Sequence, residues 1–187
     1  WVIAGSSSEY GNVSFKKRKL NKDDTPLPMS DYAKTKYIFN QKIISLAKKH
    51  KAKLRIMRLF PLYGESEKKH RLYSVVVKHA KENKNLTLIN GNELRDYLDV
   101  KIAVRSLYES LNFKIKKINS SYQIWHIASG KYSSIESFAK KIYKKSNGRG
   151  KIISKTKNNI FLDNLHHCSD LQSIWCCLKN KRRYKKI

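Results

Sequence analysis

The chain has 187 residues, 40% of them hydrophobic, which is enough for one domain with a substantial core and excludes a disordered chain. No run of about 18 or more apolar residues occurs, so we expect no membrane span. Lys and Arg total 41 against 14 Asp and Glu, and the resulting formal net charge of +27 raises nucleic acid as a partner.

The first half of the chain has the alternating pattern of strands and helices. In chain order it predicts a strand at 2–4, a polar loop at 11–28, a helix from Ser30 or Asp31 to about His50, and a strand at 54–59. The first strand ends in Gly5 and a run of three serines, and the second ends in Pro61 and Gly64. Glycine, proline and serine favour loops, so both strands lead into turns.

The second half continues the alternation. It predicts helices at 73–83, at 101–111 and after Ser133 or Ser134, strands at 86–89 and 122–128, and a short, partly apolar segment at 95–100. Such alternation favours an α/β protein with a mainly parallel sheet. Ligands of these sheets bind beyond the carboxyl ends of the strands. Because the serine run and residues 59–64 both follow strands, we expect one site there.

Tyr32 and Lys36 are the side chains best suited to chemistry. Their i, i+4 spacing places them on one face of the predicted helix. A nearby ammonium lowers the pKa of a tyrosine, which can then exchange a proton with a substrate hydroxyl or carbonyl, while a serine hydroxyl holds the same oxygen. The hydride would have to come from a cofactor. A solvated pair on a lysine-rich helix is the alternative that spacing alone leaves open.

Five segments, in the same order, resemble the NAD-dependent epimerase/dehydratase family, the extended short-chain dehydrogenase/reductases. They are WVIAGSSSEYG (1–11), PMSDYAKTK (28–36), RLFPLYG (58–64), NGNELRDYLDV (90–100) and WHIASGKYSSIESFA (125–139). The resemblance implies the C-terminal part of a Rossmann-like doubly wound parallel sheet, with a small α/β substrate-binding region. It places the latter part of the NAD(P)-binding domain at 1–60 and a mixed, substrate-binding region with returning Rossmann elements at 61–187.

The resemblance also implies roles for individual residues. Ser6 matches the catalytic Ser/Thr, with Ser7 as the fallback if the register slips. Tyr32 matches the catalytic acid/base, and Lys36 matches the residue that lowers the tyrosine pKa and binds the nicotinamide ribose. The backbone near Ala4 and Leu59 would lie beside the nicotinamide of NAD or NADP.

A nucleotide-sugar substrate is the implied partner. Arg95 matches the arginine that grips the diphosphate, where a guanidinium fork suits phosphate oxygens, and Arg71 is a second phosphate or ribose contact. A surface pair between Arg95 and Asp96 is the alternative for that arginine. The substrate-binding residues expected are Ser6, Ser7, Pro61, Arg71 and Arg95.

Departures from the family pattern narrow the type of reaction that is expected. Pro61 stands where the family has an asparagine that binds the sugar nucleotide, and His126 replaces another asparagine. Ser7 and Ser8 stand where the family's 4,6-dehydratases carry an Asp-Glu pair. An epimerase or reductase is therefore favoured, with a 4,6-dehydratase as the alternative.

The cofactor loop is missing from this chain. No Gly-x-x-Gly-x-x-Gly occurs, although in the family that loop opens the protein and holds the cofactor pyrophosphate. Together with a start at Trp1, this predicts a piece of a longer enzyme that is inactive by itself. The family resemblance also implies a homodimer paired through the catalytic helix.

Cysteine and lysine usage give weaker expectations. Cys168, Cys176 and Cys177 form no disulfide framework, so a reducing, cytoplasmic location is expected. Their spacing with His166 and His167 fits no standard zinc pattern, and we expect no metal. The lysines are scattered, without a zinc-finger or RNP pattern, so we expect no nucleic-acid function, although a basic binding protein without catalysis stays the alternative.

Overall fold

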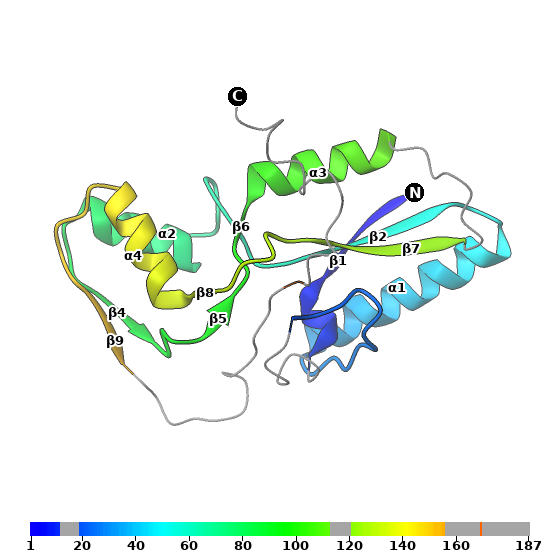
Figure 1. Ribbon diagram of the computed structural model, residues 1–187, viewed down its shortest axis with the longest axis horizontal. Coiled ribbons are helices and arrows are strands. Elements are labelled where there is room, and N and C mark those ends of the chain that lie inside the picture. The colour runs from blue at the N-terminus through cyan, green and yellow to red at the C-terminus, as the bar shows by residue number, and fades with distance from the viewer. Residues whose placement is uncertain (12–18, 113–120, 156–168, 170–187) are drawn as a thin grey trace.

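The computed structural model describes residues 1–11, 19–112, 121–155 and 169, and it is an α/β structure (Figure 1). The first elements are β1 (Val2–Ser6), the 3₁₀ helix η1 (Ser7–Tyr10), α1 (Asp31–Lys49), β2 (Leu54–Leu59), β3 (Leu62–Tyr63), α2 (Leu72–Lys81) and β4 (Leu86–Ile89). The remainder are β5 (Leu94–Arg95), β6 (Leu98–Asp99), α3 (Val100–Asn112), β7 (Tyr122–Ile127), β8 (Ser133–Ser134), α4 (Ile135–Lys145) and β9 (Ile152–Lys155).

The main sheet is parallel, with strand order β1-β2-β7. In its register Ile56 of β2 lies between Ile3 of β1 and Ile124 of β7. β2 is buried from Leu54 to Arg58, as expected for a central strand that is covered on both faces. The parallel arrangement confirms the fold class that the alternation of elements predicts.

One helix covers each face of this sheet, because successive strand residues point to opposite sides. Ile44 of α1 packs in a cluster with Ile56. Ala103 of α3 packs with Met57, the next residue of β2, and with Ile127. Figure 1 shows α1 and α3 on opposite sides of the three strands.

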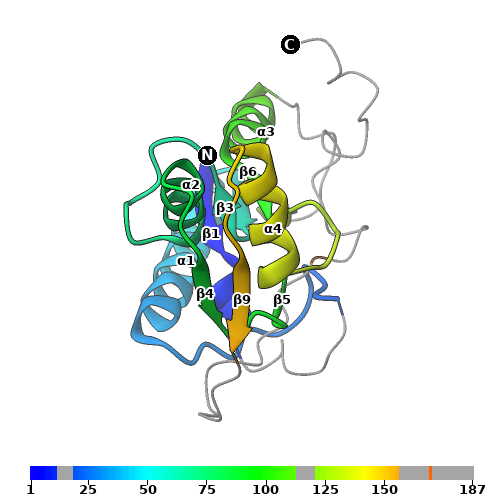
Figure 2. The ribbon, with the colours of Figure 1, turned by 90° about the vertical axis from the view of Figure 1, so that its left-hand side faces the viewer.

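A smaller lobe is built from α2, α4 and the parallel pair β4–β9 (Figure 2). Its buried cluster is apolar: Val76, Ala80, Leu86, Leu88, Phe138, Ala139, Ile142 and Tyr143. Tyr97 stacks on Phe138 with a centroid separation of 3.8 Å. The short strand pairs β3–β6 and β5–β8 are formed by the segments that connect this lobe to the main sheet.

The long elements lie where the sequence predicts them, with ends that move by one or two residues. Of the two candidate caps, Ser30 caps α1, since its hydroxyl accepts a hydrogen bond from the Ala33 amide, and Ser134 caps α4 in the same way. Among the described residues, no helix has both the length and the apolar character needed to cross a membrane.

Candidate functional site

A cavity of about 970 Å³ opens beyond the carboxyl ends of β1 and β2, where parallel sheets bind ligands. It is lined by every residue that the sequence predicts for the site: Ala4, Ser6, Ser7, Tyr32, Lys36, Leu59, Pro61, Arg71 and Arg95. The chain thus brings together groups from β1, α1, β2, the start of α2 and β5. The chemical roles assigned to them from sequence stay predictions.

Ser6 is held at the end of β1 by the turn that follows it. Its hydroxyl oxygen accepts a hydrogen bond from the Ser8 amide at 3.2 Å, which caps η1. The Ser6 and Ser8 hydroxyl oxygens are hydrogen-bonded at 2.7 Å. Ser6 stays half-buried at the cavity wall, whereas Ser7 is buried, so Ser6 has the more accessible hydroxyl.

Tyr32 and Lys36 lie on consecutive turns of α1. The Lys36 ammonium donates a hydrogen bond to the carbonyl oxygen of Ala4 at 3.2 Å, which ties the helix to β1. The Tyr32 side chain is 60% exposed and lines the cavity. A second tyrosine, Tyr97, also lines it, but burial raises the pKa of Tyr97 to about 12. That makes Tyr97 the poorer candidate for proton transfer near neutral pH.

The far wall of the cavity is cationic. Its cationic side chains are Arg71, Arg95 and Lys68, and His70 and Glu67 line it as well. Arg71 pairs with Glu67 at 3.6 Å. Burial raises the pKa of Glu67, and the charge of Arg71 opposes that shift.

Arg95 does not form the surface pair with Asp96 that the sequence leaves open. It pairs with Glu93, two residues earlier. Neighbours in an extended chain point to opposite sides, whereas residues two apart share a side. Asp96 is instead fully buried, and its carboxylate accepts hydrogen bonds from the amides of Ser129 and Gly130, both at 2.7 Å. Burial raises the pKa of Asp96, although these bonds oppose the shift.

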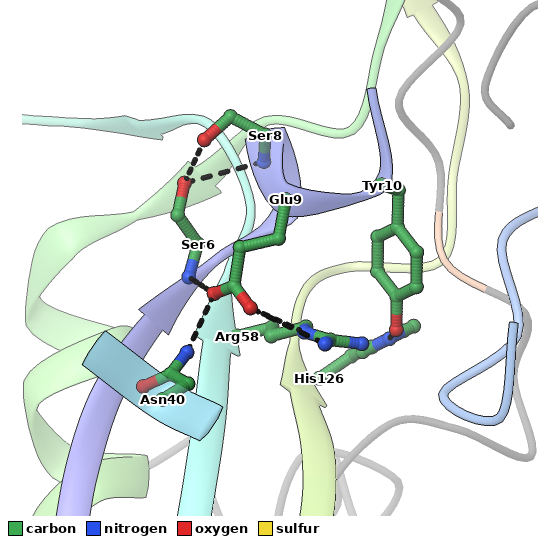
Figure 3. Close-up of polar contacts among 7 residues, drawn as sticks. All are labelled: Ser6, Ser8, Glu9, Tyr10, Asn40, Arg58 and His126. Atoms are coloured by element: carbon green, nitrogen blue, oxygen red, sulfur yellow. Dashed lines mark hydrogen bonds and ion pairs between the residues drawn. The ribbon is translucent and has the colours of Figure 1, made fainter. Parts of the chain in front are cut away.

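A buried polar cluster beneath η1 is absent from the sequence expectations (Figure 3). Glu9 pairs with Arg58 of β2, with 3.2 Å between Arg58 Nη2 and Glu9 Oε2, and both side chains are at most 2% exposed. The Arg58 guanidinium also lies over the Tyr10 ring, 4.4 Å from its centroid. The only sequence signal for this cluster was Glu9, a single acidic residue that follows the serines at the end of the strand. Hydropathy does not reveal whether such a charge is buried.

His126 of β7 extends this cluster. Its Nε2 and the Tyr10 hydroxyl are hydrogen-bonded at 2.5 Å, and its Nδ1 lies 2.8 Å from the Ser169 hydroxyl. Burial, reinforced by the charge of Arg58, lowers the pKa of His126 to about 3. The imidazole is therefore neutral at physiological pH, which makes it part of the packing rather than a proton donor.

The other features of the structure are weaker candidates for a functional site. A second cavity, of about 480 Å³, lies between residues 22–26, α1 and β7, and it contains none of the predicted site residues. Within the described parts of the chain, no group of three or more His, Cys, Asp or Glu side chains is placed to hold a metal ion. The histidine and cysteine group at 166–168 and 176–177 and the basic tail at 179–186 lie outside the described residues.

The parallel sheet, with a helix on each face and a cavity at its strand ends, defines a Rossmann-like α/β protein. Residues 1–124 match the model of the NAD dependent epimerase/dehydratase family, and the chain belongs to that family. No curated protein matches the chain.

Solved structures similar to the chain have the same fold. They include the UDP-glucuronic acid 4-epimerase from Bacillus cereus in complex with UDP-glucuronic acid and NAD, with 21% identity, a TM-score of 0.77, and coverage of 95% of this chain and 55% of that one. RMD from Pseudomonas aeruginosa, complexed with NADPH, has 14% identity, a TM-score of 0.76 and coverage of 96% and 58%. The dTDP-glucose 4,6-dehydratase from Bacillus anthracis, in complex with NAD, has 17% identity, a TM-score of 0.74 and coverage of 97% and 55%. The chain spans little more than half the length of these proteins.

Proposed function

We propose that the chain is the catalytic and substrate-binding part of an NAD(P)-dependent nucleotide-sugar epimerase or reductase. The observation that carries this proposal is the single cavity that Ser6, Tyr32, Lys36 and Arg95 line together. These residues come from three separate elements, β1, α1 and β5, which local helix or strand geometry alone would not bring to one cavity. The family membership supports the same reaction class.

The residues at the β1 and β2 ends suit the nicotinamide end of the cofactor. Ala4 is exposed at the cavity wall, and Leu59 lines the wall from the neighbouring strand. The Lys36 ammonium donates a hydrogen bond to the Ala4 carbonyl, and it would hold the ribose hydroxyls of the bound cofactor. NAD(P), when bound, supplies or accepts the hydride.

The chain's own groups handle the proton. Tyr32 exchanges a proton with the sugar oxygen at the carbon that gains or loses hydride. Ser6 steadies the same oxygen by a hydrogen bond. The Ser6 hydroxyl oxygen accepts a hydrogen bond from the Ser8 amide. When the Ser8 hydroxyl also donates to this oxygen, the hydroxyl hydrogen of Ser6 is available to donate to the substrate.

The cationic wall suits the diphosphate of the substrate. Arg95 and Arg71 offer planar forks that match phosphate oxygens, and Lys68 adds a third positive charge. Arg95 is oriented by its pair with Glu93. The cavity volume of about 970 Å³ lies at the upper end of the roughly 300–1,000 Å³ of ligand pockets, as a nucleotide sugar requires.

An epimerase or reductase fits better than a 4,6-dehydratase. Elimination of water needs acid and base groups beside the sugar, yet Ser7 and Ser8 follow Ser6 in the chain. The next residue, Glu9, is fully buried and paired with Arg58, so its carboxylate is committed to the protein.

The test is the variant Tyr32→Phe in the full-length, NAD(P)-loaded enzyme that contains this chain. We expect kcat for hydride transfer to fall by roughly 100- to 10,000-fold, because the proton donor is lost. Cofactor affinity should stay within about a factor of two, since the ring and Lys36 remain. Tyr108→Phe, a change at a similarly exposed tyrosine on α3, is the matched control and should leave kcat unchanged. Full activity of Tyr32→Phe with nucleotide sugars would exclude the assignment.

A further inference from the structure

Glu9 makes polar contacts with three separate elements while it is fully buried. Its Oε1 accepts hydrogen bonds from the Ser6 amide at 2.8 Å and from Nδ2 of Asn40 at 2.9 Å. Its Oε2 accepts a hydrogen bond from Nε of Arg58 at 3.2 Å and forms the ion pair with Nη2. Figure 3 shows the carboxylate at the point where β1, α1 and β2 meet.

Asn40 connects this buried cluster to the candidate catalytic residues on α1. Tyr32, Lys36 and Asn40 are spaced by four residues along α1, so they lie along one face of the helix. A bond from Glu9 to Asn40 therefore limits both the rotation of α1 and its sliding along β1. The same carboxylate oxygen holds the backbone of Ser6, so one atom links the serine to the helix of the other two groups.

The surrounding chain leaves little freedom for this carboxylate. A Cβ atom on Gly5 would lie 2.9 Å from Glu9 Oε1 and 3.0 Å from Ile56, so only glycine leaves room for the observed arrangement. A buried ion pair is also a poor way to gain stability, because desolvation offsets much of the attraction between the charges. Apolar side chains of similar size would stabilise this junction as well, but they would not fix the backbone of Ser6.

We propose that Glu9 is a positioning residue for the centre formed by Ser6, Tyr32 and Lys36. Its carboxylate sets the distance between the serine hydroxyl on β1 and the Tyr-Lys pair on α1. The inference rests on the proposed hydride-transfer function. Displacement of reacting groups by about 1 Å is enough to slow an enzyme roughly 100-fold, so loss of this link should affect rate more than binding.

The direct test is Glu9→Gln in the full-length, NAD(P)-loaded enzyme that contains this chain, assayed with a nucleotide sugar. We expect kcat to fall by about 10- to 100-fold while KM changes less than about threefold, because the substrate contacts remain. Glu109→Gln is the matched control: it removes the same charge from a carboxylate–arginine pair on α3, remote from the cavity, and should change neither constant.

A milder variant keeps the proposal testable if Glu9→Gln does not fold. Asn40→Ala removes only the bond from the helix to Glu9, together with a buried amide oxygen that has no hydrogen-bond partner. It should fold and lower kcat by several-fold at unchanged KM. Amide hydrogen exchange gives a second readout, since the Ser6 amide should exchange faster in Glu9→Gln than in the wild type or in Glu109→Gln.

The double variant Glu9→Gln/Arg58→Met distinguishes a role of Glu9 in positioning the site from a role in stability alone. Removing the uncompensated guanidinium should restore the unfolding midpoint lost in the single variant, whereas kcat should stay low. Recovery of kcat together with stability, or a Glu9→Gln protein with normal kcat, would overturn the positioning role. A full-length enzyme containing this chain that transfers no hydride with any nucleotide sugar overturns the proposed function and this role together, a result distinct from the other two.

Discussion

The two buried regions of the molecule differ in what they bury. Under the carboxyl ends of the main sheet lie charged and polar groups, among them Glu9, Arg58 and His126. The smaller lobe buries a cluster in which Tyr143 is the only residue with a polar side-chain atom. Its hydroxyl donates to the carbonyl oxygen of Lys84 at 2.9 Å, so even this atom serves to close a turn.

This difference indicates that the two regions have different roles. Buried polar groups cost free energy unless they are fully hydrogen-bonded, so they persist where they hold a specific geometry. The polar region reaches the cavity wall through the hydrogen bond from the Ser6 amide to Glu9, whereas the apolar lobe reaches it through Tyr97, which lines the cavity and stacks on Phe138. Changes in the lobe should therefore alter stability, and changes in the polar region should alter rate or pH dependence.

The largest effect that sharpens this comparison is expected for Ile142→Ala in the lobe. Ile142 is 5% exposed within the apolar cluster, and its truncation leaves a cavity that costs about 2–5 kcal/mol of unfolding free energy. Urea unfolding should show that loss, while kcat and KM below the melting range stay at wild-type values. Ile102→Ala on α3, where the side chain is 43% exposed, is the control and should cost far less. A change in kcat without lost stability would contradict this difference in roles.

The sequence predicts the lobe and the sheet better than it predicts the polar region. Periodicity locates long elements such as α1 and β2, because each carries several apolar residues in phase. The two-residue strands, such as β5, are too short to show a period. Strand β9 was not predicted, since only its pairing with the distant β4 distinguishes it from a loop.

The same limit applies to the site. Family resemblance selects Ser6, Tyr32 and Lys36, which do line one cavity, but it assigns no role to Glu9 or Asn40. Nothing in a residue's type states that a glutamate will be fully buried, because burial depends on residues from other segments. The partner of Arg95 was likewise fixed by local extended geometry rather than by adjacency in sequence.

An intermediate effect is expected from acid on the polar region. The folded-state pKa of His126 is lowered to about 3, against about 6.5 unfolded, so the unfolded chain binds more protons between those values. This contribution to stability is complete above pH 6.5 and is lost as the pH falls, by about 1.4 kcal/mol per pH unit between about pH 6 and 4. The lobe cluster contains no group that titrates there.

The variant His126→Asn isolates this contribution. Unfolding free energies measured by urea at pH 7, 6, 5 and 4 should fall less steeply for the variant than for the wild type, by about the same 1.4 kcal/mol per pH unit. Comparing the two slopes cancels the titration of Asp96 and Glu67, whose raised pKa values act with the opposite sign in this range. Parallel slopes would mean that His126 is protonated in the folded protein and that the polar region is more hydrated than its burial indicates.

The smallest effect is expected for Ser8→Ala, which tests whether the polar region controls rate one hydrogen bond at a time. The variant removes the hydroxyl that lies 2.7 Å from the Ser6 hydroxyl, but Ser6 still caps η1, because its hydroxyl oxygen still accepts the hydrogen bond from the amide of residue 8. One such bond contributes about 1 kcal/mol, so kcat should fall roughly fivefold, with KM unchanged. Ser45→Ala, at an exposed serine of α1, is the control and should leave kcat unchanged. If Ser8→Ala instead lowered stability and left kcat intact, the serine pair would serve the turn rather than the orientation of Ser6, and the polar region would resemble the lobe more closely than its composition implies.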